Sequence, residues 1–177
     1  MTTNQPIDVA IIGGGPAGYA AAIYAARSNL TTTVIEQGMS GGQIATTNEV
    51  ENYPGIPLLS GAELGERFQQ HAEGLGAQVA WSMVTGIDYD ADAALFTVHH
   101  DTGDTVASSV IACMGATPRS AGFVGEDTYR GRGVSYCATC DGMFFRGKQV
   151  FVIGGGNAAC EEALFLSEIA SSVTIVL

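Results

Sequence analysis

The pattern of apolar and polar positions at the start of the chain predicts a strand, a turn, a helix and a second strand. Residues 7–12 (IDVAII) form an apolar run rich in β-branched side chains, and residues 33–36 (TVIE) form another. Between them lie a glycine cluster at 13–18 and an alanine-rich stretch at 19–28. Pro16 falls near the first helical turn, where its missing N–H is not needed. The segment therefore predicts a βαβ unit.

The same order of elements returns near the other end of the sequence. Residues 148–153 predict a strand, 154–159 a glycine turn, 160–169 a helix and 173–177 a strand. The stretches VAIIGGGPAG and VFVIGGGNAA are near repeats of each other. Because internal repeats report on architecture, we interpret the chain as an α/β protein with two mononucleotide-binding starts.

Weaker patterns describe the middle of the chain. Residues 38–42 are expected to form a loop, and Ser60 with Glu63 forms a capping box that predicts the start of a helix. Two strand-like runs, 95–99 and 105–112, flank Asp-Thr-Gly-Asp and predict a β-hairpin. One face of the predicted helix carries residues at helical spacing, namely Leu64, Phe68, His71 and Leu75.

A change in composition indicates a domain junction. Between residues 115 and 133 the sequence becomes rich in Pro, Gly and Arg, and the junction is predicted near Pro118–Arg119. We therefore expect one domain over residues 1–117 and a second over residues 118–177. Each domain would contain one of the two glycine turns.

The overall composition excludes several classes of function. A hydrophobic fraction of 46% with 14% charged residues indicates a well-buried globular protein rather than a disordered one. A net charge of −11 with seven Lys and Arg excludes a nucleic-acid partner, because phosphate backbones need clustered basic side chains. The opening MTTNQPID lacks a basic, apolar leader, and no apolar run is long enough for a membrane span. We therefore expect a cytoplasmic protein without membrane contact, whose four cysteines do not form structural disulfides.

The first glycine turn has the residue types that bind a dinucleotide. In such a turn the first glycine permits a tight bend, the second lets the backbone approach a pyrophosphate, and the third lets helix and strand pack closely. Gly13, Gly15 and Gly18 occupy these positions, and Glu36 lies where a ribose-binding acid belongs. A plain tight turn in an α/β domain is the alternative, but the order of strand, helix and acid favours a dinucleotide.

The second glycine turn lacks the acid. It has Gly154, Gly156 and Ala159 at the corresponding positions, and Leu177 aligns with Glu36 of the first unit. A ribose 2′-hydroxyl therefore has no obvious acceptor here, which leans toward NADP rather than NAD.

A cysteine pair lies between the two turns. Cys137 and Cys140 form a C-x-x-C pair followed at once by Asp141, and such a pair can be a structural disulfide, half of a zinc site or a redox dithiol. Zinc needs four ligands, and the other cysteines, Cys113 and Cys160, are single and are expected to be buried. A redox dithiol is favoured, because a thiolate near a helix start has a lowered pKa. Asp141 either transfers a proton to this pair or caps the following turn.

Two dinucleotide turns around a C-x-x-C pair suggest an electron path from a nicotinamide through a flavin to a dithiol. Here the chain resembles the N-terminal part of the low-molecular-weight thioredoxin reductases, through GGGPAGYAAAIYAAR, GGQIATTNEVENYPG, GATPR, GRGVSYCATCDGMFFRGK and GGGNAACEEALFLS. The resemblance implies a Rossmann-like FAD-binding domain of the three-layer ββα type, followed by the start of a second Rossmann-like NAD(P)-binding domain. It also implies a homodimer that passes electrons from NADPH through FAD to the disulfide and on to thioredoxin.

The resemblance further implies roles for individual residues. Cys140 would lie next to the flavin, Cys137 would attack thioredoxin, and Asp141 would protonate the leaving thiolate. An apolar patch that receives thioredoxin would include Met143 and Phe144, with Arg132 close by. The cofactor contacts expected in this way are Gly13, Gly15, Pro16, Ala17, Gly18, Glu36, Gln37, Gly41, Gly42, Gln43, Asn52, Val84, Gly115, Gly154, Gly156, Asn157, Ala158 and Ala159.

The chain also departs from the family pattern. Cys113–Met114 stands where the family has Ala-Thr before GATPR. The HRR cluster for the 2′-phosphate, the rest of the NADPH domain and the late Gly-Asp segment of the FAD site are absent. We therefore expect a fragment of a longer protein, marginally stable alone and poor at retaining FAD. Two alternatives stay open, a flavin reductase fed by ferredoxin and a non-catalytic flavin-binding fragment.

Overall fold

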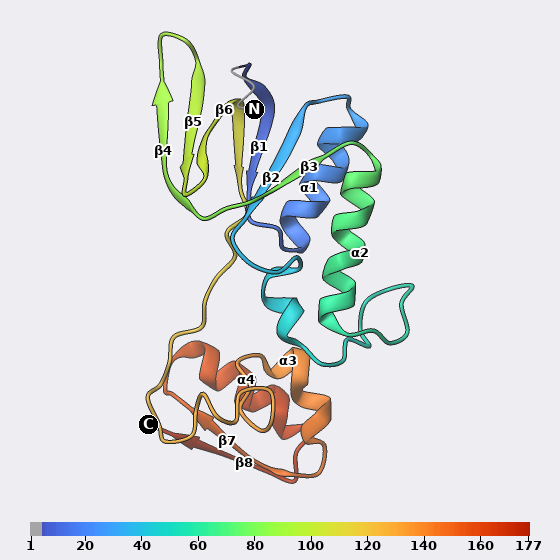
Figure 1. Cartoon of the computed structure of the whole chain (residues 1–177). Helices are drawn as coiled ribbons and strands as arrows, with labels where there is room; N and C mark the ends of the chain where they lie inside the picture. Colours follow the sequence, from blue (N-terminus) through green and yellow to red (C-terminus); the bar gives the residue numbers. More distant parts are fainter. Residues whose placement is uncertain (1–4) are drawn as a thin grey trace. The chain divides into compact units, whose positions relative to one another are not determined.

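The computed structural model describes residues 5–177 and divides into two compact units between Ala116 and Thr117 (Figure 1). Each unit has its own sheet and its own buried core. The sequence analysis found no leader at the start of the chain, and residues 1–4 of that stretch lie outside the described residues. Among residues 5–177, no helix combines the length and the apolar character needed to pass through a membrane.

The first unit is built on a six-stranded mixed sheet (Figure 1). Its elements are β1 Ile7–Ile12, α1 Pro16–Arg27, β2 Thr32–Glu36, the 3-10 helix η1 Gly42–Thr46, α2 Gly61–Gly74, β3 Gln78–Trp81, β4 Val84–Asp90, β5 Leu95–His100 and β6 Gly103–Ala112. The strand order is β3-β2-β1-β6-β5-β4. Strands β3, β2, β1 and β6 pair in parallel, and β6, β5 and β4 form an antiparallel meander.

The central strand β1 is buried on both faces, as its continuous apolar run predicts. Ile11 packs with Tyr19 of α1 and Ala72 of α2, so the two helices cover one face. Ile12 belongs to a second cluster with Val98 of β5, so the antiparallel part of the sheet supplies the cover of the other face. The predicted α/β, Rossmann-like fold is confirmed, with β1 carrying the first glycine turn at its C-terminal end.

Most predicted elements of this unit are confirmed. The hairpin pairs β5 with β6, and the capping box is complete, because Ser60 Oγ accepts from Glu63 N at 3.2 Å and Glu63 Oε2 accepts from Ser60 N at 3.2 Å. Strands β3 and β4 were not predicted, because most of their side chains are exposed or half-buried and the apolar alternation is weak.

The predicted apolar face of α2 is wrong in its second half. His71 and Leu75 are exposed. The buried stripe instead starts with glycine, and a Cβ at Gly65 would collide with the backbone of Ser40. Because a pattern of apolar side chains does not count glycine, it placed the stripe on the wrong residues. The residues that face inward are Gly61, Leu64, Gly65, Phe68 and Ala72.

The second unit contains the repeat of the strand, turn, helix and strand order (Figure 1). Its elements are α3 Ala138–Asp141, the 3-10 helix η2 Gly142–Phe145, β7 Gln149–Ile153, α4 Asn157–Ser167 and β8 Ser172–Val176. Strands β7 and β8 pair in parallel. Their inner face packs on α4 and α3 through Ala138, Val152, Ala163 and Leu166, whereas the side chain of Phe151 on the opposite face is 63% exposed. The helix begins three residues earlier than predicted, at Asn157 instead of Cys160.

Candidate functional site

The first glycine turn connects β1 to α1, and two of its glycines are required by packing. Gly13 has φ +101°, and a Cβ there would collide with the carbonyl oxygen of Cys113. A Cβ at Gly18 would collide with the carbonyl oxygen of Gly13. The bend and the close approach of helix and strand, both predicted for these positions, therefore follow from the structure itself.

Gly15 differs from the other two glycines of this turn. Its φ is −81°, and among residues 5–177, apart from its two chain neighbours, a Cβ there would come no closer than 3.9 Å to another residue. Neither conformation nor packing of the protein demands glycine at this position. The space in front of it is open, as needed for a ligand that approaches the backbone closely.

The N-terminus of α1 is left without a cap. No side chain caps Gly15, whereas α2 has a complete capping box at Ser60. The first N–H groups of a helix have no partner within the helix, and together with the helix dipole they favour an anion. Pro16 and Ala17, at the start of α1, are exposed. These features fit the pyrophosphate of a dinucleotide.

Glu36 and the loop after β2 lie against this turn. Glu36 Oε2 accepts from Gly14 N at 2.5 Å, and its Oε1 accepts from Gly38 N at 2.8 Å. Gly41, with φ +105°, donates its N–H to Gly14 O at 2.8 Å. A Cβ at Gly42 would lie 3.3 Å from the Cα atom of Gly15. The structure thus brings the predicted acid and the predicted Gly-Gly pair to the first turn.

A chain of buried and partly buried hydrogen bonds holds this loop in place, and no pattern in the sequence indicated it. Ser40 Oγ donates to Gln69 Oε1 of α2 at 2.5 Å, and the Tyr19 hydroxyl lies 2.6 Å from Ser40 Oγ. Burial raises the pKa of Tyr19. Because the single proton of Ser40 Oγ goes to Gln69, the Tyr19 hydroxyl donates to Ser40. The loop is therefore tied to both α1 and α2.

The other residues expected at this cofactor are more dispersed. Gln37, Gln43 and Asn52 are exposed, and Asn52 lies in a loop closed by backbone pairing of Val50 with Leu59. Gly115 is exposed with φ +67°. Val84 is half-buried and packs against the cluster around Ile12, which is a core position. Among residues 5–177 no hydrogen bond joins these residues to the first glycine turn, although Gly115 follows Met114, whose Cα lies 3.4 Å from a Cβ built at Gly13.

The second glycine turn repeats the backbone of the first. Gly154 N donates to Val176 O at 2.8 Å, just as Gly13 N donates to Ile35 O at 2.9 Å. Leu177 therefore takes the place of Glu36, and a Cβ at Gly155 would collide with the Leu177 side chain. An apolar side chain thus stands where the first turn has a carboxylate.

Helix α4 is also uncapped and open at its start. No side chain caps Gly156, and a Cβ there would meet no atom within 4 Å. Asn157 and Ala158 are exposed at the first helical positions, and Ala159 fits with its Cβ 3.7 Å from a Cβ built at Gly154. The second turn therefore has the same anion-binding features as the first.

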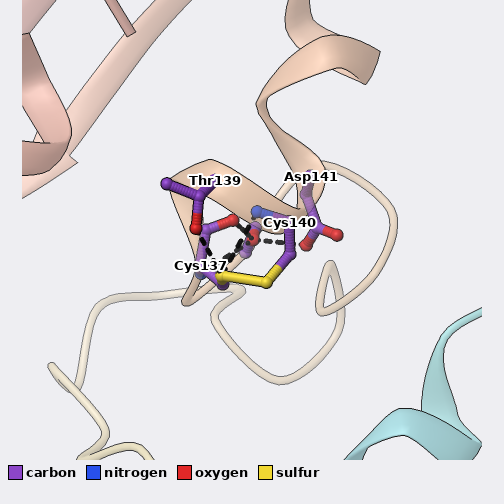
Figure 2. The surroundings of a disulfide bond; sticks show 5 residues. Cys137, Thr139, Cys140 and Asp141 are labelled. Carbon is purple, nitrogen blue, oxygen red and sulfur yellow. Dashed lines mark hydrogen bonds between the residues drawn. A yellow bond between two sulfur atoms is a disulfide. The ribbon is translucent and has the colours of Figure 1, made fainter. Parts of the chain in front are cut away.

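The cysteine pair is closed as a disulfide at the start of α3, with Cys137 as the N-cap residue and Cys140 within the helix (Figure 2). The Cα atoms of Cys137 and Cys140 are 5.3 Å apart, Cys137 is half-buried and Cys140 is exposed. Cys137 Sγ accepts from Cys140 N at 3.2 Å and lies 3.4 Å from Thr139 Oγ1. A disulfide sulfur has no proton, so the Thr139 hydroxyl donates. Donors at Cys137 Sγ would stabilise a thiolate there after reduction.

The Asp141 side chain accepts a hydrogen bond from Ser135 and does not cap the 3-10 helix η2 that follows. Its Oδ2 atom accepts from Ser135 Oγ at 2.5 Å, and Asp141 N donates to Cys137 O at 3.1 Å. Asp141 precedes η2 but makes no capping hydrogen bond with its side chain. The capping alternative is therefore wrong. Ser135 and Thr139 were missed by the sequence analysis, although both are hydroxyl residues within SYCATCD.

A buried carboxylate organises the segment that leads to the pair. The side chain of Glu126 is buried, with 3% of the residue exposed. Its pKa is lowered to about 2, first by the hydrogen bond from Ser120 Oγ and then by those from the Tyr136 hydroxyl and the N–H groups of Ala121 and Gly122. Tyr136 directly precedes Cys137, so Glu126 joins residues 120–122 to the backbone of the cysteine pair. No pattern in the sequence indicated this role.

The remaining predicted residues of this unit have mixed outcomes. Met143 is 49% exposed and Phe144 44% exposed, and Arg132 is also exposed. Cys160 is exposed, so its predicted burial is wrong, because it lies on the outer side of α4. Cys113 is half-buried against the α1 side of the core, and burial raises the pKa of its thiol. Among residues 5–177, no three His, Cys, Asp or Glu side chains gather as a metal site would require.

Comparisons with known proteins extend these observations. The sequence profile described as pyridine nucleotide-disulphide oxidoreductase matches residues 7–177. Thioredoxin reductase of Bacillus subtilis is 44% identical over 99% of this chain and 55% of its own length. Glucosaminate ammonia-lyase of Pseudomonas fluorescens is 44% identical over 95% of this chain and 52% of its own length. The solved thioredoxin reductase of Streptococcus pyogenes has a TM-score of 0.91 at 43% identity, covering 99% of this chain and 56% of that one. The chain thus spans about half the length of the curated relatives it matches.

Proposed function

The chain belongs to the pyridine nucleotide-disulphide oxidoreductase family, and from this membership we propose that it carries the FAD turn and the redox disulfide of a thioredoxin reductase. Electrons would pass from NADPH through FAD to the Cys137–Cys140 disulfide and on to thioredoxin. The observation that carries the proposal is a disulfide closed within a C-x-x-C turn, in a chain with two open glycine turns.

We assign FAD to residues 1–117 and NADPH to residues 118–177. In the first domain the uncapped start of α1 would hold the pyrophosphate, and Glu36 would hold the ribose. In the second domain the absence of an acid at Leu177 supports NADPH. Bound flavin supplies a two-electron acceptor that can exchange an electron pair with a disulfide.

The reduced cysteine pair would act on thioredoxin in two exchange steps. Cys137 thiolate attacks one sulfur of the thioredoxin disulfide, a mixed disulfide forms, and the departing thioredoxin thiolate takes a proton from Asp141. Cys140 then loses its proton to Asp141 and attacks Cys137 Sγ. The second thioredoxin sulfur leaves as a thiolate and takes that proton back from Asp141. The internal disulfide is restored, and thioredoxin has gained two electrons and two protons.

The hydrogen bonds at Cys137 Sγ support this order of events. Cys137 Sγ already has donors from Cys140 N and Thr139 Oγ1, so it is the sulfur on which negative charge is best stabilised. The exposed Met143 and Phe144 follow the pair directly and would form the apolar patch for thioredoxin. A cytoplasmic homodimer completes the proposal on the strength of the family resemblance.

The other candidate functions differ in what reduces the flavin and in whether turnover occurs. A ferredoxin-fed reductase would have no use for the open second turn at Gly156, which favours NADPH. A non-catalytic fragment would bind flavin without turnover. The relative named glucosaminate ammonia-lyase is as similar as the first reductase, so activity must be measured directly.

The test uses the full-length flavoprotein under anaerobic conditions. We expect NADPH to bleach the flavin absorbance and to drive reduction of thioredoxin, and we expect Cys140→Ser to abolish turnover. Cys160→Ser is the matched control, because that cysteine is exposed on α4 and outside the pair, and it should keep full activity. Absence of bleaching by NADPH, or full turnover in Cys140→Ser, would refute the proposal.

A further inference from the structure

We propose that Ser135 is a positioning residue that aims the Asp141 carboxyl group at the departing thiolate, an inference that rests on the proposed function. Ser135 Oγ donates to Asp141 Oδ2 at 2.5 Å and accepts from Cys137 N at 3.1 Å. One hydroxyl thus joins the proton donor to the backbone of the cysteine that attacks the substrate. Figure 2 shows Asp141 at the end of α3, beside the disulfide, with a hydrogen bond drawn to its carboxylate.

The hydrogen-bond inventory of a serine fixes the direction of these bonds. A hydroxyl has one proton, and the contact of Ser135 Oγ with Cys137 O is 3.3 Å, longer than its 2.5 Å contact with the Asp141 carboxylate. The proton therefore goes to the carboxylate. A lone pair receives the Cys137 N–H, so both bonds can exist at once.

Asp141 needs this bond because little else orients its side chain. The helix that carries it, α3, spans only residues 138–141, and the Asp141 side chain makes no cap with η2. Among the hydrogen bonds of residues 5–177, the bond from Ser135 is the one that reaches the Asp141 carboxylate from another side chain. A proton donor acts only within hydrogen-bond reach of its acceptor, so a freely rotating carboxyl group would be a poorer acid.

In the proposed step, Cys137 thiolate forms a bond to one substrate sulfur, the substrate S–S bond breaks, and the departing thiolate takes the Asp141 proton. The need for that proton depends on the leaving group. An alkyl thiolate is basic and leaves faster when protonated, whereas a nitro-substituted aromatic thiolate leaves unaided. A residue that positions the acid must therefore matter for the first substrate class and not for the second.

The experiment uses the full-length flavoprotein, with the cysteine pair reduced and the reductant removed, and follows re-formation of the Cys137–Cys140 disulfide by stopped flow. The two oxidants are hydroxyethyl disulfide and a nitro-substituted diaryl disulfide. Ser135→Ala is expected to slow the reaction with hydroxyethyl disulfide about tenfold and to change the aryl reaction less than twofold, since a general acid as a whole contributes about 100-fold or more. Ser135→Thr, which keeps the hydroxyl, should restore the rate to within about threefold.

A double-mutant cycle tests whether Ser135 acts through Asp141. Asp141→Asn should slow only the alkyl reaction, and adding Ser135→Ala to it should cause no further loss. Ser167→Ala is the matched control, because its hydroxyl donates to Leu164 O within α4, outside the segment that carries the cysteine pair. Equal slowing of both oxidants by Ser135→Ala, or additive losses in the double variant, would overturn the inference. Failure of the full-length protein to reduce thioredoxin with NADPH would refute the proposed function while leaving these exchange results standing.

Discussion

Replacing the second glycine of the first turn should separate folding from cofactor binding. In Gly15→Ala the new Cβ would lie 3.9 Å or more from protein atoms, and the backbone φ of −81° suits alanine. The remaining cost is that of alanine at a helix N-cap, at most about 1 kcal/mol. In Gly18→Ala the Cβ would collide with the carbonyl oxygen of Gly13. Overpacking against backbone of this kind costs about 3 kcal/mol.

These costs translate into measurable shifts. At about 4 °C per kcal/mol for a domain of this size, Gly18→Ala should lower the Tm by about 12 °C and Gly15→Ala by no more than about 4 °C. FAD affinity should instead be sensitive to Gly15→Ala, the variant with the smaller change in Tm. Gly15→Ala removes close approach to the pyrophosphate, and loss of one or two charge-assisted hydrogen bonds, about 3 kcal/mol, corresponds to roughly 100-fold weaker binding.

The assay combines thermal unfolding by circular dichroism, without added FAD, and titration of FAD fluorescence on the same samples. Gly74→Ala is the matched control, since that glycine lies in α2, and its Cβ would meet no atom within 4 Å. It should bind FAD normally. A Gly15→Ala variant that is destabilised as much as Gly18→Ala, or that binds FAD as tightly as the original chain, would contradict the role assigned to Gly15.

Three further predictions concern the second unit and the cysteines. The pKa of Glu126 is about 2 against 4.5, so its contribution to the free energy of unfolding is present above pH 4.5 and is lost as the pH falls toward 2. Urea unfolding from pH 6 to pH 2 should show this loss, and Glu126→Gln should reduce the pH dependence of stability. Because burial raises the pKa of Cys113 while Cys160 is exposed, iodoacetamide at pH 8 should modify Cys160 first, and peptide mass spectrometry that finds Cys113 modified first would contradict the structure. Thr139→Val removes a hydrogen-bond donor to Cys137 Sγ and should slow alkylation of reduced Cys137 at pH 7 about threefold, the effect of a hydrogen bond worth somewhat under 1 kcal/mol. An unchanged alkylation rate would exclude that hydrogen bond.

The elements that the sequence predicts best are those whose signals are local. Strand β1 is buried on both faces and therefore shows an unbroken apolar run, and the cap at Ser60 is encoded within four residues. The first glycine of each repeated turn, Gly13 and Gly154, has a positive φ, which glycine adopts without strain, so the sequence repeat predicts the repeated backbone.

What the sequence did not predict depends on contacts between distant residues. The buried stripe of α2 includes Gly65 because the backbone of Ser40 approaches it, and no periodicity of side chains can show that. The chain from Tyr19 through Ser40 to Gln69 and the donors around Glu126 likewise arise only when separate segments meet. Ser135 lies close to the cysteine pair in sequence, but its role appears only in the bond to Asp141.

The two glycine turns share a sequence pattern but tolerate different side chains. A methyl group at residue 18 has nowhere to go, whereas the equivalent place in the second turn already holds Ala159 without strain. A transplant of GNAACE from the second turn into the first would therefore carry the same cost as Gly18→Ala, about 3 kcal/mol, while the reciprocal graft would have only a small entropic cost. The two copies of the motif thus differ in the clearance between helix and strand, and exchange of the turns is well tolerated in one direction only.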